Sequence, residues 1–177
     1  MPTPEETTQQ AHKAYQKGNF QAAAEHFAAA AEAYKKAGNL ALAAEMANNC
    51  SVALLQAGNA QGALEAAMGT EKVFQDTGDT SKQAMAFGNQ AAAYDALGQF
   101  DLAERNYKKS AEIFKSIGET DLHSQVMKSY SAMLLRSGRQ MEALSAMQAG
   151  IEQVKKPNLK QRILNSLLKI PFKLLKK

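Results

Sequence analysis

The sequence of 177 residues has no tryptophan, only four prolines and a single cysteine, Cys50. One cysteine cannot form a disulfide within the chain, and we expect Cys50, on the core side of a predicted helix, to be an inert apolar residue. No apolar run approaches the roughly 20 residues that span a bilayer. The amino terminus has neither the basic region nor the apolar run of a signal peptide. These absences predict a cytoplasmic protein.

Motifs for catalysis and for cofactors are also missing. His12, His26 and His123 are far apart in the repeat array, and none belongs to a cysteine or carboxylate arrangement that resembles a metal or nucleophile site. The glycines follow predicted helices rather than strands, which argues against phosphate loops and dinucleotide sites. We therefore expect no enzyme activity, no metal and no cofactor. No nucleic acid is expected as a partner, because the basic carboxyl end has no interleaved aromatics apart from Phe172.

What the sequence does contain is a repeat of forty residues in an alanine-rich chain. Turn glycines recur at Gly18, Gly58, Gly98 and Gly138. The four similar stretches that begin with these glycines are GNFQAA, GNAQGA, GQFDLA and GRQMEA. A second series of breaks lies midway, at 38–39, 78–79, 118–119 and 157–158. Because glycine and proline end helices, this punctuation predicts helices over 4–17, 20–37, 40–57, 60–77, 80–97, 100–117, 120–137 and 140–156.

The third copy shows why each unit is expected to be a helical hairpin. Phe87, Ala91 and Tyr94 follow one another at helical spacing before Gly98, and Phe100, Ala103 and Tyr107 do so after it. Two helices joined by a short glycine turn pack closely only where a side chain at their crossing is small. Ala91 and Ala103 meet that requirement, and Ala23, Ala63 and Ala143 repeat the second of them.

On these residues each unit resembles a tetratricopeptide repeat with slightly long helices. The resemblance covers about 4–156 and implies an all-α fold, a right-handed α-α superhelix of four hairpins over 4–38, 39–78, 79–118 and 119–156. Residues 157–177 would add a capping helix and a tail, because a terminal repeat needs a lid. It also implies a binding scaffold for a protein or peptide, in which the first helix of each pair lines a concave groove.

Counting back from the turn glycines by the geometry of that family predicts the residues of the groove. They are His12, Tyr15, Glu45, Asn49, Val52, Leu55, Gln56, Met85, Asn89, Asp95, Gln125, Ser129, Leu135 and Arg136. Asn49 and Asn89 occupy equivalent places, and a ladder of amides can pair with the backbone of an extended peptide. The alternative is that these amides bond to neighbouring helices or face solvent. A carboxylate clamp is not expected, since Thr8, His12, Met85 and Asn89 stand where its basic residues would be.

The last stretch of the chain differs from the rest in charge. Residues 155–177 carry eight basic side chains and no acidic one, although the whole chain is only +4. Leu159, Ile163, Leu164, Leu167 and Leu168 mark one face of a predicted capping helix, which Pro171 ends or bends. The predicted tail residues, from the end of that helix onward, are Lys169, Phe172, Lys173, Leu174, Leu175, Lys176 and Lys177. Packing on the cap, occupation of a groove in self-association, and contact with an anionic membrane surface are the three alternatives for the tail, in that order.

Two functions follow from the sequence. The first is a scaffold or adaptor for protein–protein interaction, which binds a peptide segment of a partner in the groove. The alternative is a peripheral membrane-binding or self-assembling module that acts through the basic tail.

Overall fold

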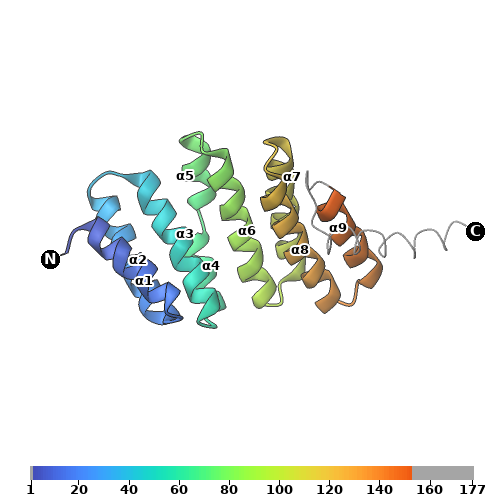
Figure 1. Ribbon diagram of the computed structural model, residues 1–177, viewed down its shortest axis with the longest axis horizontal. Coiled ribbons are helices and arrows are strands. Elements are labelled where there is room, and N and C mark those ends of the chain that lie inside the picture. The colour runs from blue at the N-terminus through green and yellow to red at the C-terminus, as the bar shows by residue number, and fades with distance from the viewer. Residues whose placement is uncertain (1, 153–177) are drawn as a thin grey trace, which may run out of the picture. The chain divides into compact units, whose positions relative to one another are not determined.

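Residues 2–152 are described by the structure, a computed structural model, and every regular element in this range is an α-helix (Figure 1). The predicted fold class, an all-α array of helical hairpins, is confirmed. The predicted capping helix and tail lie outside the described residues. The chain divides into two compact units, 1–106 and 107–177. In the described range no helix is long and apolar enough to span a bilayer.

Unit 1 contains the first two hairpins and the start of the third. Its elements are α1 (Pro4–Gln16), α2 (Phe20–Lys36), α3 (Leu40–Gln56), α4 (Ala60–Ala67), α5 (Thr70–Asp76), α6 (Thr80–Ala96) and the first residues of α7 (Phe100–Ser116). α1 packs on α2, α2 on α3 and α3 on α4, while α6 packs on both α4 and α5. Unit 2 contains the rest of α7, then α8 (Thr120–Arg136) and α9 (Gln140–Glu152), and α8 packs on α9.

Short turns with an amide or carboxylate cap start α2, α3, α4 and α6 of unit 1. The side chains of Asn19, Asn39, Asn59 and Asp79 each accept a hydrogen bond from the backbone N–H three residues later. Such a bond satisfies one of the free N–H groups in the first helical turn. The residue before each cap is a glycine with positive φ, between 74° and 83° in this series. The repeated glycines and caps of the sequence therefore mark where one helix ends and the next begins.

Small residues occupy the helix crossings, as predicted. Ala11, Ser51, Ala91 and Ser131 stand forty residues apart in the first helices, and all are at most 1% exposed. Ala23, Ala63, Ala103 and Ala143 do the same in the second helices. In unit 2 the Ser131 hydroxyl donates a hydrogen bond of 2.7 Å to the carbonyl oxygen of Ala143. The two small series therefore meet directly, which lets the helices of that hairpin approach closely.

The prediction of one continuous helix over 60–77 is wrong. α4 ends at Ala67, Met68 is extended, and Gly69 adopts φ +82° before α5 begins at Thr70. A left-handed conformation is disfavoured for residues with a Cβ. The equivalent position in the first repeat is Ala29, within the continuous α2. A glycine in the second repeat therefore permits a break that the first does not contain.

Buried polar side chains stabilise the ends exposed by this break. The Thr70 hydroxyl donates to the carbonyl oxygen of Ala67 at 2.7 Å, and Gln90 Nε2 on α6 donates to the same oxygen at 3.2 Å. Gln90 Nε2 also donates to Glu71 at 2.6 Å, and Thr70 Oγ1 lies 3.3 Å from Asn48 Oδ1 on α3. Because buried carbonyls need partners, these contacts from two neighbouring helices make the break a stable feature of the fold.

Candidate functional site

A pocket of about 180 Å³ opens in unit 1 between α1, α2 and α3. We call it the anchor pocket; its lining is His12, Tyr15, Phe27, Asn49 and Val52. All but Phe27 are residues predicted for the groove. The four predicted residues come from α1 and α3, the first helices of two consecutive hairpins, and Phe27 comes from α2. The packing of α3 beside the α1–α2 hairpin brings them together.

Aromatic contacts fix the shape of the anchor pocket. Phe27 is 2% exposed, and its ring meets His12 edge to face at a centroid distance of 5.1 Å. Tyr15 packs in the same manner against Phe20 at 5.2 Å. Edge-to-face pairs are favoured because the positive edge of one ring meets the negative face of the other. The wall of the pocket is therefore preformed, with a buried phenylalanine and an exposed histidine in contact.

Asn49 and Val52 complete the pocket from α3, and both are half-buried. Asn49 has an amide that can donate and accept hydrogen bonds, and Val52, three residues later, lies on the same side of the helix. An apolar cavity with one amide is suited to an anchor side chain whose own backbone is within reach of that amide. The arrangement offers binding and no nucleophile or acid–base pair.

The second predicted amide, Asn89, is used within the fold. Its Nδ2 donates to the backbone carbonyl oxygen of Asn48 at 3.5 Å, from α6 to α3. Asn89 therefore fits the alternative to the peptide-binding ladder, in which the amides bond to neighbouring helices. Asn49 is the amide that lines a cavity, and a peptide-binding ladder stays a prediction.

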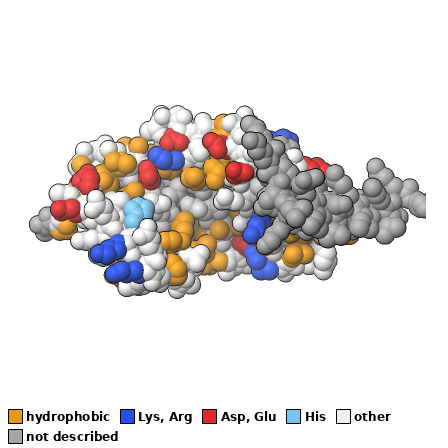
Figure 2. Space-filling model, viewed as in Figure 1, with side chains coloured by type: hydrophobic (Ala, Val, Ile, Leu, Met, Phe, Trp, Pro, Cys, Tyr) orange, Lys and Arg blue, Asp and Glu red, His pale blue; other side chains and the backbone are white. Residues whose placement is uncertain are grey.

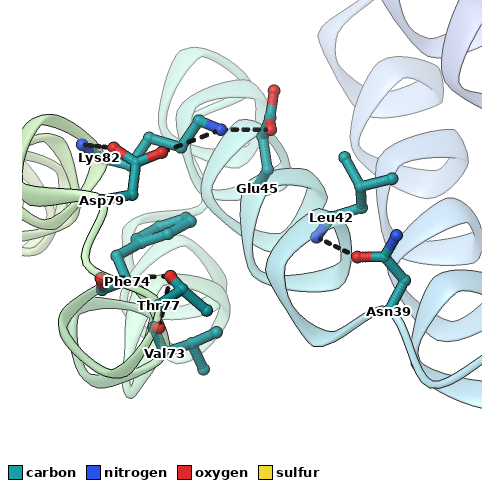
Figure 3. Close-up of polar contacts among 8 residues, drawn as sticks. All are labelled: Asn39, Leu42, Glu45, Val73, Phe74, Thr77, Asp79 and Lys82. Carbon is teal, nitrogen blue, oxygen red and sulfur yellow. Dashed lines mark hydrogen bonds and ion pairs between the residues drawn. The ribbon is translucent and has the colours of Figure 1, made fainter.

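Glu45, another predicted groove residue, belongs to an ion cluster that sequence reasoning missed. Lys82 Nζ lies 3.0 Å from Glu45 Oε2 and 3.2 Å from Asp79 Oδ2, so it links α3 to the start of α6 (Figure 3). The bond to Glu45, followed by that to Asp79, raises the pKa of Lys82. The pKa of Asp79 is lowered, mainly because its carboxylate accepts a hydrogen bond from the backbone N–H of Lys82. All three side chains are partly exposed, so the cluster contributes modestly to stability.

The remaining predicted groove residues lie on the expected helices without forming a described cavity. Leu55 and Gln56 end α3, and Met85 and Asp95 lie on α6, where Met85 is 42% exposed. Four exposed residues lie on α8 in unit 2: Gln125, Ser129, Leu135 and Arg136. In Figure 2, acidic side chains gather along the upper part of unit 1 and hydrophobic patches cross its middle. The predicted tail residues 169 and 172–177 lie outside the described residues.

The structure also places two titratable side chains discussed from the sequence, Cys50 and His123. Cys50 is buried, its thiol donates to the carbonyl oxygen of Ala24 at 3.3 Å, and burial raises its pKa, which disfavours the reactive thiolate. His123 is 5% exposed, and burial, followed by the charge of Lys115, lowers its pKa. Its Nδ1 has no hydrogen-bond partner among the described residues. Within 2–152, no cluster of three histidine, cysteine or acidic residues is arranged to hold a metal.

A second cavity, which the sequence did not predict, lies beside the helix break. This break groove has a volume of about 310 Å³. Its lining comes from α2, α3, α4, α5 and the connection between the last two: Ala31, Glu32, Lys35, Leu40, Ala43, Ala44, Ala47, Ala66, Met68, Gly69, Thr70 and Val73. Leu40 is 57% exposed and Met68 54%. The one signal in the sequence was the glycine at 69 inside a predicted helix.

Comparison with known proteins gives one match and one negative result. The family described as "SNAP: Soluble NSF attachment protein" matches residues 4–147. That range includes the anchor pocket, the break groove and most of the described helices. The search of curated proteins found no match. The family match supports a helical repeat architecture but does not specify the tetratricopeptide form of it.

Proposed function

The chain belongs to the soluble NSF attachment protein family, and from that premise we propose that it binds a segment of a partner protein at the anchor pocket. The family consists of helical adaptors that act through protein–protein contacts and not through catalysis. Membership therefore supports a protein-binding adaptor as the general role. The choice of surface and the chemistry of the bound segment depend on the residues of this chain.

The observation that carries the proposal is the convergence of residues from two consecutive hairpins on one cavity. His12 and Tyr15 of α1 and Asn49 and Val52 of α3 surround it, with the ring of Phe27 buried at its side. Its volume of about 180 Å³ is below the roughly 300–1,000 Å³ of small-molecule sites. A cavity of this size suits one anchor side chain of a longer segment.

The chemistry of the lining indicates which segment would bind. Phe27 and Val52 favour an aliphatic or aromatic anchor, and the His12 and Tyr15 rings add apolar edges with a polar tip. Asn49 can hold the backbone of the segment on either side of that anchor, whatever its other side chains are. The pocket contains no lysine or arginine, so it is not built for a carboxyl terminus. We propose an internal segment, extended or helical, with one apolar anchor.

The test is selection from a displayed library of random peptides on the immobilised full-length chain, followed by affinity measurement on the selected peptides. Asn49→Ala should weaken binding about tenfold, which corresponds to the loss of a hydrogen bond of about 1.4 kcal/mol. Val52→Asp should weaken it further, because a charge would face the anchor side chain. Thermal unfolding of each variant checks that the fold is retained.

The matched control is Gln61→Ala. Gln61 is an exposed amide on α4 whose hydrogen bond within the described range is to Glu65 on its own helix, so its removal should leave peptide binding unchanged. Selected peptides that bind the Asn49 and Val52 variants as well as the parent chain would show that the anchor pocket is not the binding site.

The alternative function through the basic tail depends on residues outside the described range. No contact, cavity or charge among the described residues favours a membrane role, and the adaptor remains the single function proposed.

A further inference from the structure

The break groove is a second surface for binding, separate from the anchor pocket. It exists because α4 stops at Ala67 and α5 starts at Thr70, where the first repeat has the continuous α2. The break is held in place by Asn48, Thr70 and Gln90, each at most 6% exposed. Because its walls are fixed by buried hydrogen bonds, the groove is a preformed feature of the surface.

The groove has the surface chemistry of a site for an apolar ridge. Alanines from α2, α3 and α4 form most of its floor, and Leu40 and Met68 stand at its edges with more than half of their surface exposed. Large apolar side chains that remain exposed beside an apolar depression are typical of interaction sites. A row of small floor residues leaves room for larger side chains from an incoming helix.

The stretch of chain that builds the groove has a net negative charge. The range 20–76, which includes α2 to α5, contains three basic and six acidic side chains, a net charge of −3. Glu32 lines the groove, with Lys35 as the one basic residue in the lining. Glu25 lies seven residues before Glu32, two turns away on the same side of α2, and its hydrogen bond comes from neutral Gln21. A basic ligand would be favoured there over an acidic one.

One segment of the chain itself has the complementary properties. Residues 155–177 carry eight basic side chains and no acidic one, and Leu159, Ile163, Leu164, Leu167 and Leu168 recur at helical spacing within it. Apolar residues at that spacing form the ridge that a groove between helices accepts. The anchor pocket is smaller and lined by a single amide and three rings, so it is less suited to such a ridge.

We propose that the segment 159–175 of one copy of the chain binds in the break groove of another copy. The contact joins two different surfaces, so it is heterologous. Repetition of it adds further copies, which form a ring if the rotation between copies closes and an open filament if it does not. A short amphipathic segment buries less than the roughly 1,600 Å² of a standard stable interface. The association should therefore be weak and concentration-dependent, and salt should weaken it because it pairs opposite charges. This inference does not depend on the proposed function.

The test is sedimentation velocity of the full-length chain over a range of concentrations, at low and at high salt. The expected result is a mass-average sedimentation coefficient that rises with concentration and falls back when salt is added. Leu40→Lys and Met68→Lys in the groove, or Leu167→Asp in the segment, should each weaken association on the order of tenfold, because a charge would face an apolar surface. Glu32→Lys should also weaken it.

Two matched controls separate the groove from a general effect of charge. Met141→Lys changes a methionine of α9 that is 46% exposed, and Glu112→Lys reverses an exposed acidic residue of α7. Both should leave the association unchanged. Circular dichroism and thermal unfolding confirm that every variant retains its fold.

A photocrosslinking residue in place of Phe172 locates the contact. In a mixture of ¹⁴N- and ¹⁵N-labelled chains, crosslinked peptides of mixed isotope that contain residues of the break groove would support the proposal. A chain that stays monomeric at all concentrations would overturn it. Crosslinks only within one chain, crosslinks to the anchor pocket, or association that groove and control variants affect equally would do the same. Binding to anionic vesicles without association between copies would assign the segment to a membrane surface instead.

Discussion

Both compact units contain buried polar side chains, but within the described range one of those in unit 2 lacks the hydrogen-bond partners that those beside the helix break of unit 1 have. In unit 1, Asn48, Thr70 and Gln90 are buried beside a break in a helix. Thr70 and Gln90 donate to the Ala67 carbonyl that the break frees, and Asn48 Oδ1 lies 3.3 Å from the Thr70 hydroxyl. In unit 2, His123 is equally buried on α8, and its Nδ1 has no partner among the described residues. A buried polar group stabilises a fold only when it is paired. The comparison predicts that the buried hydrogen bonds at the helix break stabilise unit 1, and that buried His123 lowers the stability of unit 2.

The largest expected effect comes from removing the buried hydrogen bonds that hold the helix break, which involve Thr70 and Gln90. Gln90→Ala removes the donor to Ala67 and Glu71 and leaves a buried carbonyl with fewer partners, which should lower the free energy of unfolding by about 1–3 kcal/mol. Chemical denaturation measures it, and hydrogen exchange should show the loss of protection in α4 and α5. Unchanged stability would mean that the break does not need this contact.

The burial of His123 should appear as a dependence of stability on pH. Burial lowers the pKa of His123 in the folded chain below its ordinary value of 6.5. The unfolded chain therefore binds the proton more readily. The free energy of unfolding keeps its full value above about pH 6.5 and decreases as the pH is lowered from there, by at most about 1.4 kcal/mol per pH unit.

Hydrogen exchange of α8 between pH 5 and 8 measures this effect. His123→Phe should remove the part of the pH dependence that belongs to α8, because the apolar ring needs no proton and no partner. If the variant and the parent chain lost protection in parallel on acidification, His123 would not be the group responsible.

A smaller effect is expected at the break itself. Gly69→Ala should destabilise unit 1 by about 1 kcal/mol, because alanine disfavours φ +82° even though open space surrounds its Cβ. The matched change in the continuous helix is Ala29→Gly, which should cost about as much through the lower helix propensity of glycine. Thermal unfolding compares the two.

The two substitutions should differ in their structural consequences. Gly69→Ala should disturb the hydrogen bonds of Thr70 and Gln90 to Ala67, whereas Ala29→Gly should leave α2 continuous. Amide exchange at 67–71 and at 27–31 reads each result. A stabilised Gly69→Ala chain with a continuous helix over 60–77 would show that glycine alone causes the break and that the buried hydrogen bonds do not.

Most of the fold could be predicted from the sequence because its signals are local. Glycines with positive φ end the helices, Asn39 and similar caps start them, and the small residues that fit the crossings recur every forty residues. The break at 68–69 could not be predicted in that way. A single glycine is tolerated in many helices, and here the deciding partners, Asn48 and Gln90, come from two other helices.

The candidate site was predictable in part for the same reason. The register placed His12, Tyr15, Asn49 and Val52 on the right helices, and the structure shows that they surround one cavity. The contribution of Phe27, from the second helix, required the actual packing of α2 between α1 and α3. The Lys82 contacts with Glu45 and Asp79 also depend on side-chain conformations in three dimensions, which spacing alone does not determine.

The central claim is that the anchor pocket between α1 and α3 binds the partner segment. The most direct test is hydrogen exchange of the full-length chain with and without a peptide selected on it. Binding there predicts new protection at 12–16 of α1 and 49–56 of α3, and less protection of the same regions in the Asn49→Ala chain at an equal peptide concentration below saturation. Protection confined to 60–76 around the helix break, or to α8 and α9, would contradict it.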